Sequence, residues 1–219
     1  MVFSSATFLF AFLPVVLVGV MVTPKLARNL FLLLMSLFFY AWGELYFVAL
    51  MLASIVMNYL VGAAIGNAEK KTRAAQLWLT LGIIANLSLL GYFKYANFLV
   101  ENWNLFATQL GLDSFDHTKV HLPLGISFFT FQAMSYLIDV YRGDAEHDKN
   151  PVNIALYIAL FPQLIAGPII RYHDVYLQIR ERSLSVDLAY SGLTRFICGL
   201  AKKLLIANPL GEIADQLNT

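Results

Sequence analysis

The stretch Asn29–Asn67 reads NLFLLLMSLFFYAWGELYFVALMLASIVMNYLVGAAIGN, and Glu44 is its only charged side chain. No charged side chain precedes Lys25. A bilayer core needs about 20 apolar residues per spanning helix, and soluble domains rarely expose apolar runs of this length. The chain is therefore predicted to be a membrane protein.

Composition supports the same class. Hydrophobic residues make up 59% of the chain and charged residues 13%, against about 45–50% and 25% in soluble domains. The net charge of +1 does not indicate a nucleic-acid partner. Cys198 is the one cysteine, so an internal disulfide is excluded, and we interpret it as a packing residue rather than a metal ligand.

The charge-free windows predict the first spans. Phe3–Val22 is the first; it lacks the basic start and cleavage site of a signal peptide, so we expect it to be retained. The window Asn29–Asn67 is too long for one helix and breaks naturally at Trp42-Gly43-Glu44. It then gives a short helix, about Leu30–Ala41, and a longer one, about Leu45–Ile65. Twelve residues rise only about 18 Å, so the short arm needs a thinned bilayer or a protein shield.

The later segments alternate between polar and apolar character. In chain order we expect a basic turn at Glu69–Arg73, a span at Leu77–Phe93, an interfacial helix at Tyr95–Leu110, a polar loop at Gly111–His121, an apolar run at Leu122–Ile138, a polar loop at Asp139–Lys149, a charge-free run at Asn150–Ile170, an interfacial segment at Arg171–Asp187 and a partial span at Leu188–Gly211. The predicted fold is all-α: a polytopic transmembrane bundle with short, kinked and re-entrant helices around a cavity. We expect one membrane domain, 1–219.

Positive charge sets the expected orientation. The positive-inside rule places Lys25, Arg28, Lys70, Lys71 and Arg73 in the cytoplasm and the N-terminus outside. The basic residues beyond about residue 111 cannot all be cytoplasmic if every apolar window crosses fully, so the topology of that part stays open. Irregular backbone at membrane depth must be buried in protein or line a wet cavity.

The first motif is the run from Leu122 to Gln132, which places Pro123, Ser127 and Gln132 in an apolar segment. It is a kinked helix whose Ser127 and Thr130 satisfy backbone groups freed by the proline, or it is a cavity wall.

The second motif follows on the same predicted helix. Asp139 and Arg142 are three residues apart, so they can pair on one helical face. The pair is an ordinary ion pair at a helix end or an anchor for a polar ligand group at a cavity mouth.

The third motif, from Phe161 to Pro168, holds two prolines and a glycine inside an apolar window. The residue before a proline avoids helical geometry, so we expect the helix to break at Gly167. This stretch is a candidate for backbone that lines a cavity, because Gln163 lies within it and Arg171 follows it. The alternative is a simple helix terminator.

The four histidines lie in polar or interfacial segments and are interpreted as surface residues: His117, His121, His147 and His173. The sequence contains no Ser–His–Asp order, metal-ligand spacing or phosphate-binding loop. The residues present therefore predict no complete active site and no metal site.

Seven short phrases of the sequence occur in a recognisable order. They are Val2-Phe3-Ser4-Ser5, Phe39-Tyr40-Ala41-Trp42, the run Gly91–Phe98, the run Pro123–Gln132, the run Tyr136–Gly143, the run Phe161–Pro168 and the run Gly199–Ala207. Together they resemble the membrane-bound O-acyltransferases, and specifically their bacterial alginate O-acetyltransferase branch. Each phrase is weak alone, but seven in order across nearly all 219 residues are specific.

The resemblance implies an O-acetyltransferase of the bacterial inner membrane that passes acetyl groups across it to an exopolysaccharide such as alginate. It implies acetyl-coenzyme A or another acetyl carrier as donor, no bound cofactor, and a periplasmic hydrolase-like acetyltransferase as partner, besides membrane lipid. Members of that family are much longer, and their catalytic histidine is expected beyond Thr219. The chain thus resembles the N-terminal half of a larger acyltransferase, inactive alone.

The resemblance assigns no catalytic residue here and only tunnel-wall or structural roles, to Pro123, Ser127, Gln132, Asp139, Arg142, Gln163 and Arg171. The alternative function is a non-catalytic membrane scaffold or a small transporter-like helical bundle.

Overall fold

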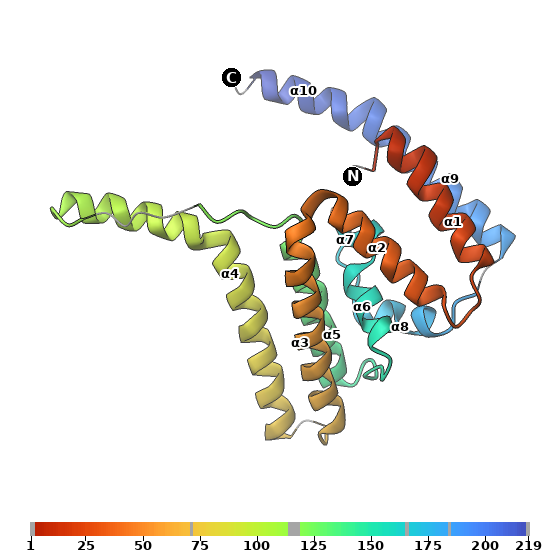
Figure 1. Ribbon diagram of the computed structural model, residues 1–219, viewed down its shortest axis with the longest axis horizontal. Coiled ribbons are helices and arrows are strands. Elements are labelled where there is room, and N and C mark those ends of the chain that lie inside the picture. The colour runs from red at the N-terminus through yellow and green to blue at the C-terminus, as the bar shows by residue number, and fades with distance from the viewer. Residues whose placement is uncertain (1–2, 71, 114–118, 165–166, 184, 218–219) are drawn as a thin grey trace. The chain divides into compact units, whose positions relative to one another are not determined.

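The computed structural model describes residues 3–70, 72–113, 119–164, 167–183 and 185–217, which form helices and no strands (Figure 1). The chain divides into two compact units. One comprises Met1–Met21 and Glu181–Thr219, and the other comprises Val22–Arg180. The all-α fold predicted from the sequence is confirmed.

The larger unit begins with a broken helical hairpin. Helix α2 spans Arg28–Glu44, a 3-10 turn spans Leu45–Phe47, and α3 spans Val48–Asn67. Glu44 leaves helical geometry, with φ −144° and ψ 59°. The break predicted at Trp42-Gly43-Glu44 is therefore confirmed, although α2 is longer than expected, at 17 residues or about 25 Å.

Helix α4, Arg73–Gln109, is one continuous helix of 37 residues that changes direction partway along (Figure 1). Thr72 caps its start, because its side chain accepts a hydrogen bond from the Ala75 N–H. The sequence predicted a span ending at Lys94 and a separate interfacial helix, and that division is wrong. Lysine is a good helix former whose long side chain can reach water, so Lys94 does not end the helix.

The helices α3 and α4 are joined by a buried pair of amides. Asn58 Nδ2 lies 3.1 Å from Asn86 Oδ1, and Asn86 Nδ2 lies 2.7 Å from Asn58 Oδ1. Each Nδ2 also donates to a carbonyl one turn earlier on its own helix. Both side chains are fully buried, so the amides satisfy each other where water is absent.

Helix α5, Ile126–Arg142, begins and ends at a glycine. Gly125 precedes it with φ +74° and Gly143 follows it with φ +81°, a region that L side chains rarely adopt. A Cβ on Gly125 would also lie 2.7 Å from the Leu164 carbonyl oxygen. Glycine at 125 therefore permits both the turn into α5 and the close approach of residue 164.

The described part of the next apolar window contains two short helices, α6 Pro151–Ala159 and α7 Phe161–Leu164, and α8, Tyr172–Arg180, follows the window. The first break lies at Leu160, where ψ is 116°, which is earlier than the break predicted at Gly167; Gly167 itself lies outside the helices. A proline cannot donate to the carbonyl four residues earlier, and its ring clashes there. Pro162 thus ends α6 before Gly167 is reached.

Among the described residues, two helical stretches are long and apolar enough to cross a membrane, Arg28–Asn67 and Arg73–Gln109. Only 33% and 22% of their most apolar windows are buried, whereas the core helix of a soluble protein would be mostly buried. Exposed leucines and aromatics, including Leu34, Trp42, Leu60 and Leu81, cover these helices. Such surfaces require lipid or protein against them, so the chain associates with a membrane.

The smaller unit contains a π-helical turn at Phe8–Phe12, most of α1, which spans Leu13–Val22, α9 at Val186–Lys202, a second π-helical turn at Lys203–Ala207 and α10 at Asn208–Leu217. The Ser185 side chain caps α9 by accepting from the Leu188 N–H at 3.2 Å. Cys198 is an exposed free thiol on α9.

Candidate functional site

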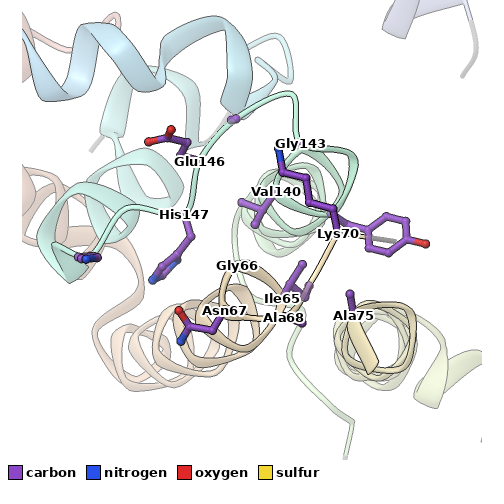
Figure 2. A pocket seen from close by; sticks show the side chains of 13 residues that line it. Ile65, Gly66, Asn67, Ala68, Lys70, Ala75, Val140, Gly143, Glu146 and His147 are labelled. Atoms are coloured by element: carbon purple, nitrogen blue, oxygen red, sulfur yellow. The ribbon is translucent and has the colours of Figure 1, made fainter. Parts of the chain in front are cut away.

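A cavity of about 260 Å³ lies where α3 and α5 end (Figure 2). Its walls come from residues 65–68, Lys70, Ala75 in the first turn of α4, and the end of α5 with the loop that follows it. Figure 2 shows Lys70 extending toward Gly143, with Glu146 and His147 on the side of the loop. The cavity is lined by both apolar and charged residues.

A histidine–tyrosine pair fixes one side of this cavity. Tyr136 Oη lies 2.6 Å from His147 Nδ1. A Cβ on Gly62 would overlap the Tyr136 hydroxyl, and one on Gly66 would lie 2.8 Å from His147 Cβ, so both glycines of α3 make room for the pair. Burial lowers the pKa of His147. The contact between the hydroxyl and Nδ1 fixes the orientation of the imidazole ring.

Asp148 is the centre of a polar network beside the cavity. Its Oδ2 accepts from Asn153 Nδ2 at 2.8 Å and from Arg180 Nε at 3.0 Å. Asn29 Nδ2 donates to Asn153 Oδ1, at 2.8 Å, and to the Ile179 carbonyl of α8. The network therefore joins α2, α6 and α8. Its residues lie far apart in the sequence, between positions 29 and 180, so sequence spacing could not pair them.

The ionisation of Asp148 follows from these contacts. Burial by itself raises the pKa of this carboxyl, but hydrogen bonds from Asn153, from the Asn150 N–H and from Arg180 outweigh it, and the pKa is lower than usual. Asp148 is therefore a stable carboxylate rather than a proton donor at neutral pH.

Asp139, a predicted site residue, is buried and does not pair with Arg142. Its Oδ2 accepts from the His173 N–H at 3.1 Å and lies 3.4 Å from His173 Nδ1. Arg142 is exposed and has no ion pair among the residues that the structure describes. The predicted pairing of Asp139 with Arg142 is wrong because His173, at the start of α8, takes the carboxylate. Asp139 thereby caps α8, whose N-terminal N–H groups attract a negative charge.

The other predicted residues lie in three different environments. Pro123 is buried before α5, Ser127 is half-buried in its first turn, and Arg171 is exposed at the start of α8. Gln163 is buried, and its Nε2 donates to the Tyr157 carbonyl at 2.6 Å. No hydrogen bond or ion pair in the described part of the chain links any two of the seven candidates.

Gln132 differs from the rest. It is 1% exposed, and neither atom of its amide has a hydrogen-bond partner within the described structure. Thr130 Oγ1 and Tyr40 Oη are buried and unpartnered too. Thr130 therefore does not satisfy a backbone group freed by Pro123, which removes one support for the kinked-helix interpretation. Buried polar groups without partners are rare, and they are where a polar ligand or water is needed.

The histidines do not form a catalytic group. His121 is exposed and lies 3.2 Å from Glu44 Oε1, whereas His147 and His173 are half-buried and held by Tyr136 and Asp139. The surface interpretation is thus wrong for His147 and His173, and His117 lies outside the described residues. No group of three His, Cys, Asp or Glu among the described residues could hold a metal ion.

Comparison with known proteins gives close relatives. The chain is 47% identical, over 216 residues and 99% of its length, to the probable alginate O-acetylase AlgI of Azotobacter vinelandii, of which it covers 43%. It is also 47% identical to the AlgI of Pseudomonas aeruginosa, covering 42% of that protein. A peptidoglycan O-acetyltransferase of Helicobacter pylori is 36% identical, matching 98% of the chain.

The chain spans less than half the length of the curated relatives that it matches. No family model and no solved structure matches it. The relatives confirm the resemblance that the sequence phrases indicated, and they locate it across nearly the whole chain rather than in the quoted phrases alone.

Proposed function

We propose that the chain belongs to the alginate O-acetyltransferase branch of the membrane-bound O-acyltransferases. It forms part of an enzyme that transfers acetyl groups across the bacterial inner membrane for O-acetylation of an exopolysaccharide. The identity of 47% over 216 residues to a probable alginate O-acetylase carries this proposal. The chain supplies walls and the cytoplasmic entrance of the acetyl path, and a histidine expected beyond Thr219 supplies the chemistry.

The described side chains are consistent with a wall rather than a catalytic centre. Acyl transfer to a hydroxyl needs a positioned base or nucleophile that substrate can reach. His147 and His173 each have a ring nitrogen close to a protein partner, and Cys198 lies on an exposed helix. Gln132, by contrast, offers an unused amide inside the larger unit, which suits a residue that lines a path for a polar group.

The donor, partners and orientation complete the proposal. Acetyl-coenzyme A or another acetyl carrier donates on the cytoplasmic side, where Arg28 and Lys70 lie, and the N-terminus lies outside. A periplasmic hydrolase-like acetyltransferase then delivers the acetyl group to the polysaccharide. The positive-inside rule supports the orientation of the first spans.

The test is reconstitution of acetyl transfer. The 219-residue chain is incubated in membranes with radiolabelled acetyl-coenzyme A, alone and together with the remaining segment of the Azotobacter vinelandii relative. We expect label turnover only when both polypeptides are present, and the same result with Cys198→Ala. Turnover by the chain alone, or none with both while full-length relative is active, contradicts the proposal; the second result favours a non-catalytic scaffold.

A further inference from the structure

We propose that the cavity at the ends of α3 and α5 binds the phosphate of an anionic phospholipid headgroup. The cavity holds about 260 Å³ and is lined by both polar and apolar residues, including Lys70, His147 and Lys149 (Figure 2). Basic pockets between membrane helices are suited to anionic headgroups. This site is inferred from the cavity itself, so its test does not depend on the proposed enzyme activity.

The charges at the cavity favour an anion. Neither Lys70 nor Lys149 has a carboxylate within ion-pair distance among the described residues. Glu146 also lines the cavity, but its Oε2 lies 3.4 Å from Arg180 Nη1. Asp148 Oδ2 lies 3.0 Å from Arg180 Nε. Since Arg180 faces both neighbouring carboxylates, the two lysine charges remain for a ligand.

Two of the groups that line the cavity, Lys70 and His147, have defined neighbours. Lys70 Nζ lies beside Gly143, where a Cβ would be only 3.2 Å from it, and this position at the C-terminus of α5 is favourable for a cation. The imidazole ring of His147 is fixed through Nδ1 by Tyr136. The two ammonium groups of Lys70 and Lys149 match the oxygen atoms of a phosphate.

The apolar part of the site favours a lipid over a soluble phosphate. Ile65, Ala75 and Val140 line the cavity. Leu77 and Trp78 follow Ala75 on α4 and are 59% and 43% exposed. Tryptophan is enriched at the headgroup level of membranes, so acyl chains can lie on the exposed face of α4 while the phosphate occupies the cavity.

The test measures lipid binding to the full chain by native mass spectrometry in detergent. Phosphatidylglycerol and phosphatidylcholine with the same acyl chains are titrated against wild type, the double variant Lys70→Gln with Lys149→Gln, and a matched control, Lys25→Gln with Arg73→Gln. The control removes the same charge outside the cavity. We expect the double variant to bind phosphatidylglycerol about thirtyfold more weakly and the control to stay within about threefold of wild type. The variant Lys70→Arg with Lys149→Arg, which keeps both charges, should also stay within about threefold.

Three outcomes overturn the proposal. Equal loss in the control variant would mean general surface attraction. Equal binding of phosphatidylcholine, whose phosphate is neutralised by its own cation, would mean that the net negative charge of the headgroup is not recognised. Displacement of phosphatidylglycerol by an equimolar amount of inorganic pyrophosphate would assign the cavity to a soluble phosphate instead of a lipid.

Discussion

Two polar regions of the larger unit, both buried in part, differ in how their hydrogen bonds are satisfied. Around Asp148, each polar group named above has a partner, and the contacts join α2, α6 and α8. Inside α5, the Gln132 amide and the Thr130 hydroxyl are buried with none. A satisfied network stabilises a fold, whereas an unpartnered buried amide costs free energy. The first region is therefore structural. In the second region, we expect that the loss of folding stability from the unpartnered groups is retained because those groups serve function.

The strongest test of this contrast is Asp148→Ala. The change leaves Arg180 and Asn153 without their shared acceptor, and we expect the free energy of unfolding to fall by roughly 2–3 kcal/mol. Unfolding of the full chain in mixed detergent micelles, followed by circular dichroism, measures it. Glu146→Gln is the matched control, because that side chain is 81% exposed; it should change stability by less than about 0.5 kcal/mol.

The pH dependence of the stability that Asp148 contributes follows from the lowered pKa of its carboxyl. A carboxyl whose pKa is lower in the folded state stabilises the fold above its unfolded pKa, about 3.9. The contribution is lost as pH falls through the folded pKa. The difference between wild type and Asp148→Ala should thus be constant between about pH 5 and pH 8. A difference that disappears over that range would mean that Asp148 is not a stable carboxylate.

The sequence could predict features whose cause is local. The break at Glu44 lies where a glycine and a charge interrupt an apolar run. The early end of α6 is also local, but two prolines compete within the same run, and the sequence does not say that Pro162 acts first. Continuity of α4 through Lys94 escaped prediction because a charge marks a membrane boundary without breaking a helix.

Contacts between distant segments could not be predicted in the same way. Residue spacing pairs Asp139 with Arg142 because spacing describes contacts within one helix only. His173, 34 residues away in the sequence, contacts the carboxylate instead. Arg180 meets Asp148 across 32 residues. The choice of Gln132 as a candidate residue did identify a buried amide. A glutamine within an apolar run is often buried, because its neighbours in the run are buried too.

The third prediction concerns how Asp139 is coupled to its neighbours. Asp139→Ala removes the cap of α8, and we expect a loss of about 1–2 kcal/mol. Arg142→Ala should cost less than about 0.5 kcal/mol, because its side chain is exposed. In double-mutant cycles, Asp139 should couple to His173 and be additive with Arg142. Coupling to Arg142 but not to His173 would restore the ion pair that the sequence spacing suggested.

The smallest expected effect comes from two glutamines that differ in one respect. Both are buried, but Gln163 donates to the Tyr157 carbonyl at 2.6 Å, whereas neither amide atom of Gln132 has a partner. Gln163→Leu should therefore cost about 1 kcal/mol of unfolding free energy through its lost hydrogen bond. Gln132→Leu should leave stability unchanged or raise it, because an unpaired polar group is replaced by an apolar one of similar size.

The same variants separate stability from function. If Gln132 lines the acetyl path, Gln132→Leu should reduce acetyl turnover in the reconstituted two-polypeptide system while the chain stays as stable as wild type. Gln163→Leu should instead reduce stability, and its acetyl turnover should fall only in proportion to the fraction of chain that is no longer folded. A Gln132→Leu chain that is destabilised by 1 kcal/mol or more, on the order of one lost hydrogen bond, would mean that its amide is satisfied in the membrane. The contrast between the two regions would then be removed, because both would be structural.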